Sequence, residues 1–157
     1  MFELLNEGYH IYNIDESWLS VSDFDRCMWA QRGGPASLGD DVLKHKINII
    51  VAVSNKGDVF LAQTQVNTDD EVMSLFFSKF VQKLTNKHGA GWRDKVVIVL
   101  DGASYHRSKE TRSCITHLNI KVVLSAPYSY ESAPAELWFS LLKRNNFNPQ
   151  QIKTTKR

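Results

Sequence analysis

Three acidic residues stand where a folded chain could bring carboxylates together. Asp15 lies within an apolar, strand-like stretch, Asp101 directly follows another, and Glu136 follows a proline-containing loop at the start of an expected helix. In open α/β sheets, ligand sites gather at strand ends and the adjoining loops, which suits Asp101. Mg²⁺ prefers hard oxygen ligands and is usually held by carboxylates together with phosphate and water. Three converging carboxylates would fit metal-dependent chemistry on a phosphate group, whereas a single acid at a strand end is often only a loop cap or turn former.

The reaction that fits such a site is phosphodiester cleavage. Two divalent ions roughly 3.5–4 Å apart can activate an attacking water or 3′-hydroxyl and stabilise the leaving oxygen. Neither role needs a histidine or cysteine ligand. The carboxylates of an empty site repel one another, and metal binding relieves that repulsion. We therefore predict that Asp15, Asp101 and Glu136 are catalytic metal ligands for Mg²⁺, with Mn²⁺ as a substitute and two ions bound.

Two further residues lie close to these acids. Neighbouring side chains of a strand point to opposite faces, so Asp15 and Glu16 should not both enter one site. We assign Asp15 to the metal and Glu16 to a structural role. His106 comes five residues after Asp101 and should border the site. Contact with substrate, orientation of a carboxylate and a structural role at a helix start all remain open for His106.

The elements that must position these residues can be read along the chain. The expected elements are strands over 9–19, 47–53, 59–66, 95–100 and 120–124, and helices after residue 68, within 107–118 and from about residue 134. Residues 54–58 have turn chemistry and should join the second and third strands as a hairpin. Antiparallel strands followed by alternating helices and strands predict an α/β fold with a mixed sheet covered by helices.

The first long helix has a clear start. Thr68 is expected to cap it, with Glu71 three residues later completing a capping box. Apolar residues then recur at intervals of three and four, which predicts one broad face packed in the core. These residues are Met73, Phe76, Phe77, Phe80 and Leu84.

Four sequence blocks carry a family resemblance. They are residues 12–17 (YNIDES), 29–35 (WAQRGGP), 97–106 (VIVLDGASYH) and 127–138 (PYSYESAPAELW), with thirty-four residues between the second and third predicted catalytic acids. In this order and spacing they resemble the DDE catalytic core of the mariner-like transposase superfamily and related bacterial insertion-sequence transposases. The sequence departs from the family pattern at Gly102, Tyr130 and Ala133, where asparagine, proline and asparagine are usual.

The resemblance implies a fold and a function. The fold would be RNase H-like, with a five-stranded sheet of three antiparallel strands followed by two parallel ones. The activity would be that of a metal-dependent DNA endonuclease and strand transferase that cuts transposon ends and joins them to target DNA. Double-stranded DNA would be the partner, and family members commonly work as dimers, so a homodimer is expected. Asp15, Asp101 and Glu136 would be the DDE triad.

Basic residues near the last helix are candidates for DNA contact. Glu136, Ser140 and Lys143 share a helix face at this spacing, so Lys143 and the adjacent Arg144 could reach DNA phosphate. His106 is a third candidate because it borders the site. Phosphate contacts of this kind position a duplex without reading its sequence. The alternative for Lys143 and Arg144 is a solvated basic helix end, which the helix dipole favours.

Two other functions remain open. The first is a catalytically inactive, domesticated transposase remnant that acts as a DNA- or protein-binding module. The altered loops favour it, and retention of all three acids weighs against it. The second is another RNase H-like nuclease, such as one that acts on RNA–DNA hybrids. The thirty-four-residue interval and the block at 29–35 argue against that nuclease.

Length and composition bound the organisation. The 157 residues suit a single domain, which we place at 1–148, followed by a basic tail at 149–157. Only fourteen residues precede Asp15, too few for a helix-turn-helix module, so the N-terminal DNA-binding region of such transposases is expected to be absent. A net charge of +2 is too weak to identify a nucleic-acid binder by itself.

The sequence also bounds the compartment. No apolar run approaches the ~20 residues that cross a bilayer, so no membrane association is expected. The N-terminus lacks the pattern of a secretory signal, and the two cysteines, Cys27 and Cys114, suggest no disulfide framework or zinc site. The expected location is the nucleus in a eukaryote, or the cytoplasm and nucleoid in a bacterium, and not outside the cell.

Overall fold

The computed structural model describes residues 2–20, 46–125 and 133–144. Its elements in chain order are α1 (Phe2–Asn6), β1 (His10–Ser20), β2 (Lys46–Ser54), β3 (Val59–Thr64), α3 (Asp70–His88), η2 (Ala90–Asp94), β4 (Val96–Leu100), η3 (Tyr105–Arg107), α4 (Lys109–His117), β5 (Val122–Leu124) and α5 (Pro134–Arg144). The sequence blocks at 29–35 and 127–130 and the tail at 149–157 lie outside the described residues. Each predicted helix and strand is present, with ends shifted by a few residues.

The strands form one mixed sheet in the order β3-β2-β1-β4-β5. β1 pairs antiparallel with β2, and β2 with β3, whereas β1–β4 and β4–β5 are parallel. The expected arrangement of three antiparallel strands followed by two parallel ones is therefore confirmed. β1 is the central strand, and it carries both Asp15 and Glu16.

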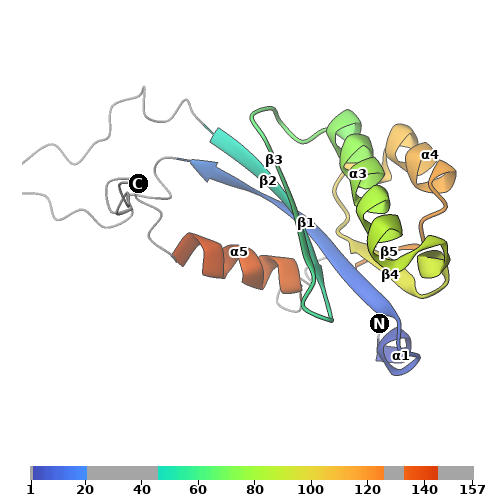
Figure 1. Ribbon diagram of the computed structural model, residues 1–157. Helices are drawn as coiled ribbons and strands as arrows, with labels where there is room; N and C mark the ends of the chain where they lie inside the picture. The colour runs from blue at the N-terminus through green and yellow to red at the C-terminus, as the bar shows by residue number, and fades with distance from the viewer. Residues whose placement is uncertain (1, 21–45, 126–132, 145–157) are drawn as a thin grey trace, which may run out of the picture.

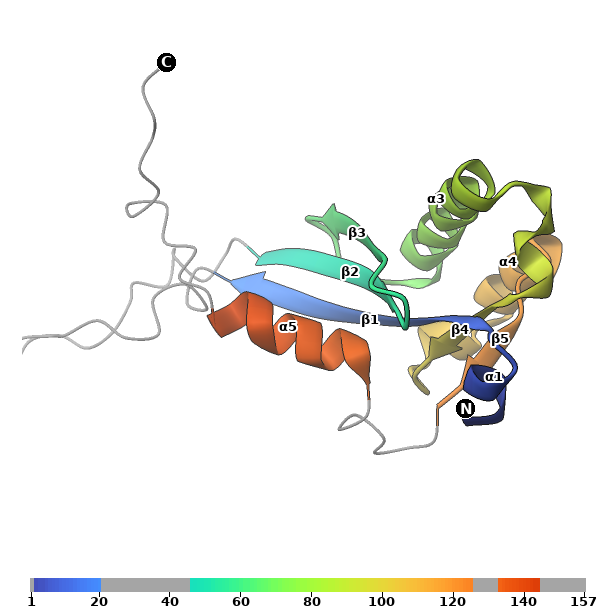
Figure 2. The ribbon, with the colours of Figure 1, turned by 60° about the horizontal axis from the view of Figure 1, so that its bottom comes forward.

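Helices cover both faces of this sheet (Figure 1). α3 and α4 lie on one face, and α5 runs along the other beneath β1 and β2 (Figure 2). Because both faces are covered, β4 reads as a continuous apolar run and is buried throughout. The larger core lies on the α3 side, where α3 contributes the stripe predicted from the sequence: Met73, Phe76, Phe77, Phe80 and Leu84, joined by Val81. The smaller core lies under α5 and contains Ile49, Val51, Ala135 and Phe139.

The hairpin between β2 and β3 forms as the turn residues predict. The Ser54 hydroxyl accepts hydrogen bonds from the backbone N–H groups of Lys56 and Asp58, at 3.1 and 2.9 Å. Gly57 has a φ of +84°, a left-handed conformation that costs glycine little because it has no Cβ. The turn places Asp58 immediately before β3.

The N-terminus of α3 corrects one prediction. The capping residue is Asp69, whose carboxylate accepts a hydrogen bond from the Val72 N–H at 2.9 Å. Thr68 does not cap the helix, because its hydroxyl is hydrogen-bonded to the buried Asn48 side chain of β2. Both residue types cap well, and a contact from a distant strand decided between them. Among the described residues, no helix is long and apolar enough to span a membrane.

Candidate active site

Asp15 and Asp101 lie side by side at the end of two parallel strands. The register of β1 and β4 pairs Tyr12 with Ile98 and Asn13 with Val99. Continued by two residues, the same register sets Asp15 opposite Asp101, which directly follows the last residue of β4. Asp101, at the carboxyl end of β4, therefore lies level with Asp15, which comes 86 positions earlier in the chain.

Asp15 points to the face of the sheet that α5 covers. Within β1, Asn13 and Asp15 share a face because side chains alternate along a strand. Asp15 is paired with Val51 of β2, and Val51 packs against Ala135 and Phe139 of α5. The helix that carries Glu136 therefore lies over the same face as Asp15.

A hydrogen bond links the start of α5 to β1. The Asn13 side-chain oxygen accepts from the Ala135 backbone N–H at 3.0 Å. The first N–H groups of a helix have no partner inside the helix, so Asn13 satisfies one of them from the neighbouring strand. Glu136 is the next residue and is exposed. Asn13 was not singled out in the sequence, where only its position two residues before Asp15 could have indicated this role.

The pKa of Asp15 is affected by the charges of the other two predicted catalytic acids. Burial is the main cause that raises the pKa of the Asp15 carboxyl, from an ordinary value of 3.8 to about 6. The negative charges of Glu16, Glu136 and Asp101 add to the increase, while a hydrogen bond from the Glu16 N–H opposes it. The charges of the other two predicted catalytic acids thus reach Asp15.

Asp101 differs from Asp15 because it is held by hydrogen-bond donors. Its Oδ1 lies 2.7 Å from His106 Nδ1 and accepts from the Ala103 N–H at 3.0 Å. The hydrogen bond from His106 is the largest cause that lowers the pKa of the Asp101 carboxyl, and the Ala103 N–H adds to it. The side chain is 55 % exposed, so this carboxylate is ionised, oriented and accessible from solvent.

His106 links Asp101 to Glu16, a buried acid on the face of the sheet opposite to Asp15. Its Nε2 lies 3.0 Å from Glu16 Oε1, and Glu16 Oε2 accepts from the Tyr105 hydroxyl at 2.8 Å. Burial alone would lower the pKa of His106, but hydrogen bonds to Asp101 and Glu16 raise it to about 9. The imidazole is therefore a cation at neutral pH between two carboxylates. The structural role predicted for Glu16 agrees with this geometry, as does its separation from Asp15 by strand alternation.

The predicted DNA contacts have different surroundings. His106 is 2 % exposed, and both ring nitrogens face carboxylates. This burial favours orientation of Asp101 over the direct DNA contact predicted from the sequence. Lys143 is half-buried near the end of α5, on the helix of Glu136. The backbone of Arg144 ends that helix, and its side chain lies outside the described residues.

Comparison with known proteins gives a match to one family and matches to solved structures. A sequence model of the family described as DDE superfamily endonuclease matches residues 10–157. A comparison with curated proteins finds no match. Among solved structures, the fold is similar to the Mos1 mariner paired-end complex with Mn (TM-score 0.65, 18 % identity, 89 % of this chain and 45 % of that chain).

Two further Mos1 structures match in the same way. The paired-end complex of Mos1 transposase with the left transposon end has a TM-score of 0.64 at 18 % identity, covering 91 % of this chain and 45 % of that chain. The catalytic domain of Mos1 mariner transposase has a TM-score of 0.62 at 16 % identity, covering 91 % of this chain and 65 % of that chain. The chain thus spans about half the length of the transposases in the two complexes. At this identity the likeness concerns the fold, which is RNase H-like.

Proposed function

Because this chain belongs to the DDE superfamily of endonucleases, we propose that it is the catalytic domain of a mariner-like transposase. Its reaction would be Mg²⁺-dependent cleavage of DNA at transposon ends and transfer of the freed strand to target DNA. The observation that carries this proposal is geometric: the register of β1 and β4 sets Asp15 opposite Asp101, and the 3.0 Å hydrogen bond between Asn13 and the Ala135 N–H holds the start of α5 over the same face. Asp15 and Asp101 thus come from adjacent strands and Glu136 from the helix over the same face, although the ligand atoms of the three do not all lie within 4.8 Å of one another.

The donor set fits hard divalent cations. Asp15, Asp101 and Glu136 would hold Mg²⁺ or Mn²⁺ through carboxylate oxygens, the ligand type that Mg²⁺ prefers. Two ions at such a site would supply an activated nucleophile and stabilise the leaving oxygen. A bound cation would relieve the repulsion that the charges of Glu16, Glu136 and Asp101 add to burial in raising the pKa of Asp15. The Mos1 paired-end complex whose fold this chain resembles contains Mn.

The chain's own residues would set the geometry of the site. His106 fixes the orientation of Asp101 from the opposite side, and its positive charge keeps that carboxylate ionised. Asn13 fixes the first turn of α5 and with it the backbone beside Glu136. Lys143 and Arg144, at the other end of α5, would contact the DNA backbone and position the duplex. Pairing of two transposon ends would need a second copy of the chain.

A cleavage assay with matched acid variants tests the proposal. The substrate is supercoiled plasmid DNA, incubated with the chain and Mg²⁺ or Mn²⁺, and nicking is quantified on gels. Asp15→Asn, Asp101→Asn and Glu136→Gln should each reduce nicking by about two orders of magnitude or more, because each removes a charged group at the reacting phosphate. Asp94→Asn, which changes an exposed acid of η2 before β4, is the control and should nick like the wild type.

The outcomes separate the alternatives. Nicking that depends on metal and on all three acids supports the proposal. Nicking that survives in all three variants contradicts it. If the wild type binds metal and DNA but never cleaves, the chain is the inactive remnant instead. Preference for RNA–DNA hybrids over duplex DNA would point to the other RNase H-like activity.

A further inference from the structure

A group of side chains that could hold a metal ion lies at the other end of β1 from Asp15. His10 begins β1, Asp58 precedes β3, and His88 ends α3. One ligand atom from each lies within 4.8 Å of the other two. Along β1, His10 is five residues before Asp15, which is roughly 16 Å at about 3.3 Å per strand residue. The group is therefore separate from the proposed catalytic site.

The His10 ring is buried with an unsatisfied nitrogen. The residue is 7 % exposed, and its Nε2 makes no hydrogen bond to any described residue. That nitrogen lies 3.3 Å from Asp58 Oδ2, and the His88 ring meets the His10 ring edge-on with centroids 5.5 Å apart. A buried nitrogen that approaches a carboxylate at 3.3 Å without forming a hydrogen bond is poorly satisfied, and such an atom calls for a ligand or another explanation.

We propose that His10, Asp58 and His88 bind a divalent transition-metal ion of the Zn²⁺ class. Two imidazoles and one carboxylate are the ligand types of this ion, whereas Mg²⁺ favours oxygen alone. Ligand atoms about 2.0–2.1 Å from a tetrahedral centre lie about 3.4 Å apart. The 3.3 Å between His10 Nε2 and Asp58 Oδ2 is already that separation. The fourth position would be left to water.

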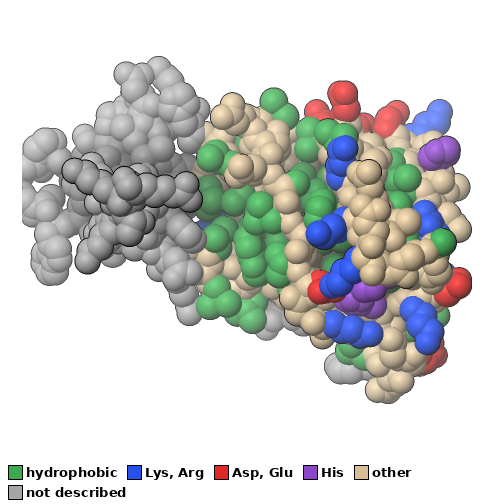
Figure 3. All heavy atoms as spheres, viewed as in Figure 1, with side chains coloured by type: hydrophobic (Ala, Val, Ile, Leu, Met, Phe, Trp, Pro, Cys, Tyr) green, Lys and Arg blue, Asp and Glu red, His purple; other side chains and the backbone are tan. Residues whose placement is uncertain are grey.

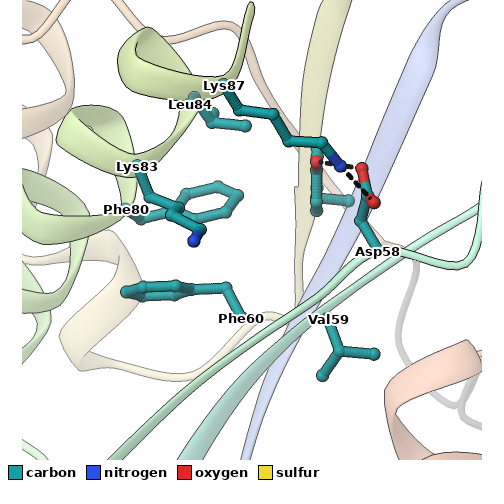
Figure 4. Close-up of a pocket in the computed structure, with 8 residues that line it drawn as sticks. Asp58, Val59, Phe60, Phe80, Lys83, Leu84 and Lys87 are labelled. Atoms are coloured by element: carbon teal, nitrogen blue, oxygen red, sulfur yellow. Dashed lines mark hydrogen bonds and ion pairs between the residues drawn. The ribbon is translucent and has the colours of Figure 1, made fainter.

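The surroundings orient Asp58 and His10. The Tyr12 hydroxyl donates to Asp58 Oδ2 at 3.1 Å, and the Tyr12 ring stacks on His10 with centroids 4.6 Å apart. Lys87 reaches from α3 to the other carboxylate oxygen, as the dashed lines of Figure 4 show. Partners of this kind fix the direction of metal ligands. Lys87 pairs with Oδ1, and Oδ2 is the oxygen that lies against His10 Nε2.

An open groove gives an ion access to the group. It has a volume of about 470 Å³ and is lined by all three residues. Histidine side chains lie among basic ones below α3 on the face shown in Figure 3. The positive charges of Lys56 and Lys87 disfavour binding of a metal cation. Burial is the main cause that lowers the pKa of His10, and these two lysines add to it. The neutral imidazole is the form that binds metal. The site would therefore be weaker than one without lysines.

Metal titration of the complete 157-residue chain tests this site. The background is Asp101→Asn, so that the proposed catalytic acids contribute little. Zn²⁺ binding is measured by calorimetry, and Co²⁺ is used as a probe because tetrahedral coordination gives a visible absorption band. His88→Ala removes an exposed ligand without disturbing the core, and His117→Ala removes an exposed histidine at the end of α4 as the matched control.

We expect one Zn²⁺ per chain, a tetrahedral Co²⁺ spectrum, and affinity at least roughly tenfold weaker in His88→Ala than in His117→Ala. Zn²⁺ should also raise Tm in the His117→Ala variant more than in His88→Ala, because a ligand that binds only the folded state stabilises it. Equal affinity in the two variants, or no Zn²⁺ binding at millimolar concentration, would overturn the proposal. Neither result depends on cleavage activity, so the proposed transposase function is tested separately.

Discussion

The Asn13 side chain in β1 accepts a hydrogen bond from the Ala135 N–H at the start of α5, at 3.0 Å and across 122 residues of sequence. This contact joins the strand that carries Asp15 to the helix that carries Glu136. Because Glu136 is itself exposed, the contact fixes the backbone beside it and not its side chain. The position of Glu136 relative to Asp15 therefore depends on Asn13 and Ala135, two uncharged residues that lie near these acids in the sequence.

Asn13→Ala should lower cleavage more than it lowers stability. Loss of one hydrogen bond costs about 1 kcal/mol in the free energy of unfolding. A small displacement of the first turn of α5 should reduce kcat by roughly 10- to 100-fold, because catalytic geometry tolerates little misplacement. The control is Asn55→Ala, far from the acids, which removes two hydrogen bonds: Asn55 Oδ1 accepts from the Ile11 N–H at 3.0 Å, and Asn55 Nδ2 donates to the Tyr9 carbonyl at 3.1 Å. Equal kcat losses in the two variants would contradict a positioning role for Asn13.

His106→Ala should destabilise the fold. The side chain is fully buried, and its removal leaves Glu16, whose side chain is 8 % exposed, with one partner in place of two. Breaking a buried charged pair in this way costs about 3 kcal/mol in the free energy of unfolding. Urea unfolding measures the loss, and the double variant Glu16→Gln/His106→Ala should recover part of it. A loss below about 0.5 kcal/mol, the size of an ordinary surface substitution, would rule out the pair as a stabilising contact.

The stabilisation by His106 should also depend on pH. Its folded pKa of about 9 lies above the ordinary value of 6.5, so the protonated ring favours the folded state. This contribution is fully present below pH 6.5 and is lost as the pH rises through about 9. The difference in unfolding free energy between wild type and His106→Ala should therefore shrink between pH 6.5 and 10. A difference that stays constant across this range would mean that the ring is not charged.

The Asp15 carboxyl should lose its proton at a higher pH than an ordinary aspartate in the metal-free protein. NMR of the side-chain carboxyl should give a pKa of about 6 instead of 3.8, because burial and neighbouring carboxylates disfavour its ionised form. Asp101→Asn removes one of those charges and should lower this pKa. Metal binding needs the ionised form, so Mg²⁺ affinity should rise as the pH increases through about 6. An Asp15 pKa that stays the same in Asp101→Asn would contradict an interaction between these two carboxylates.

Much of the fold follows from local patterns in the sequence. The apolar runs, the hairpin turn and the stripe on α3 are short-range features, and they predicted the elements and the mixed sheet. The choice between Thr68 and Asp69 as helix cap was predicted wrongly, because the hydrogen bond that occupies Thr68 comes from Asn48, twenty positions earlier. Tertiary contacts of this kind leave no local signal.

The candidate site divides in the same way. Asp15, Asp101 and Glu136 stood out by chemistry, by spacing and by the family resemblance, and strand alternation separated Glu16 from Asp15. The bridge from Asp101 through His106 to Glu16 could not be derived, since it crosses the sheet between residues 90 positions apart. The group of His10, Asp58 and His88 was likewise beyond prediction, because its members belong to three elements and no spacing links them.

A crystal soaked in Mn²⁺, with the metal located by anomalous scattering, tests the proposed catalytic site most directly. The account predicts Mn²⁺ bound to Asp15 and Asp101 with Glu136 facing it, and loss of that peak in Asp101→Asn. A peak at the His10 group would not affect this conclusion, because that group lies at the other end of β1 from Asp15. If the three carboxylates point apart and bind no Mn²⁺ at millimolar concentration, the chain does not carry the proposed metal site.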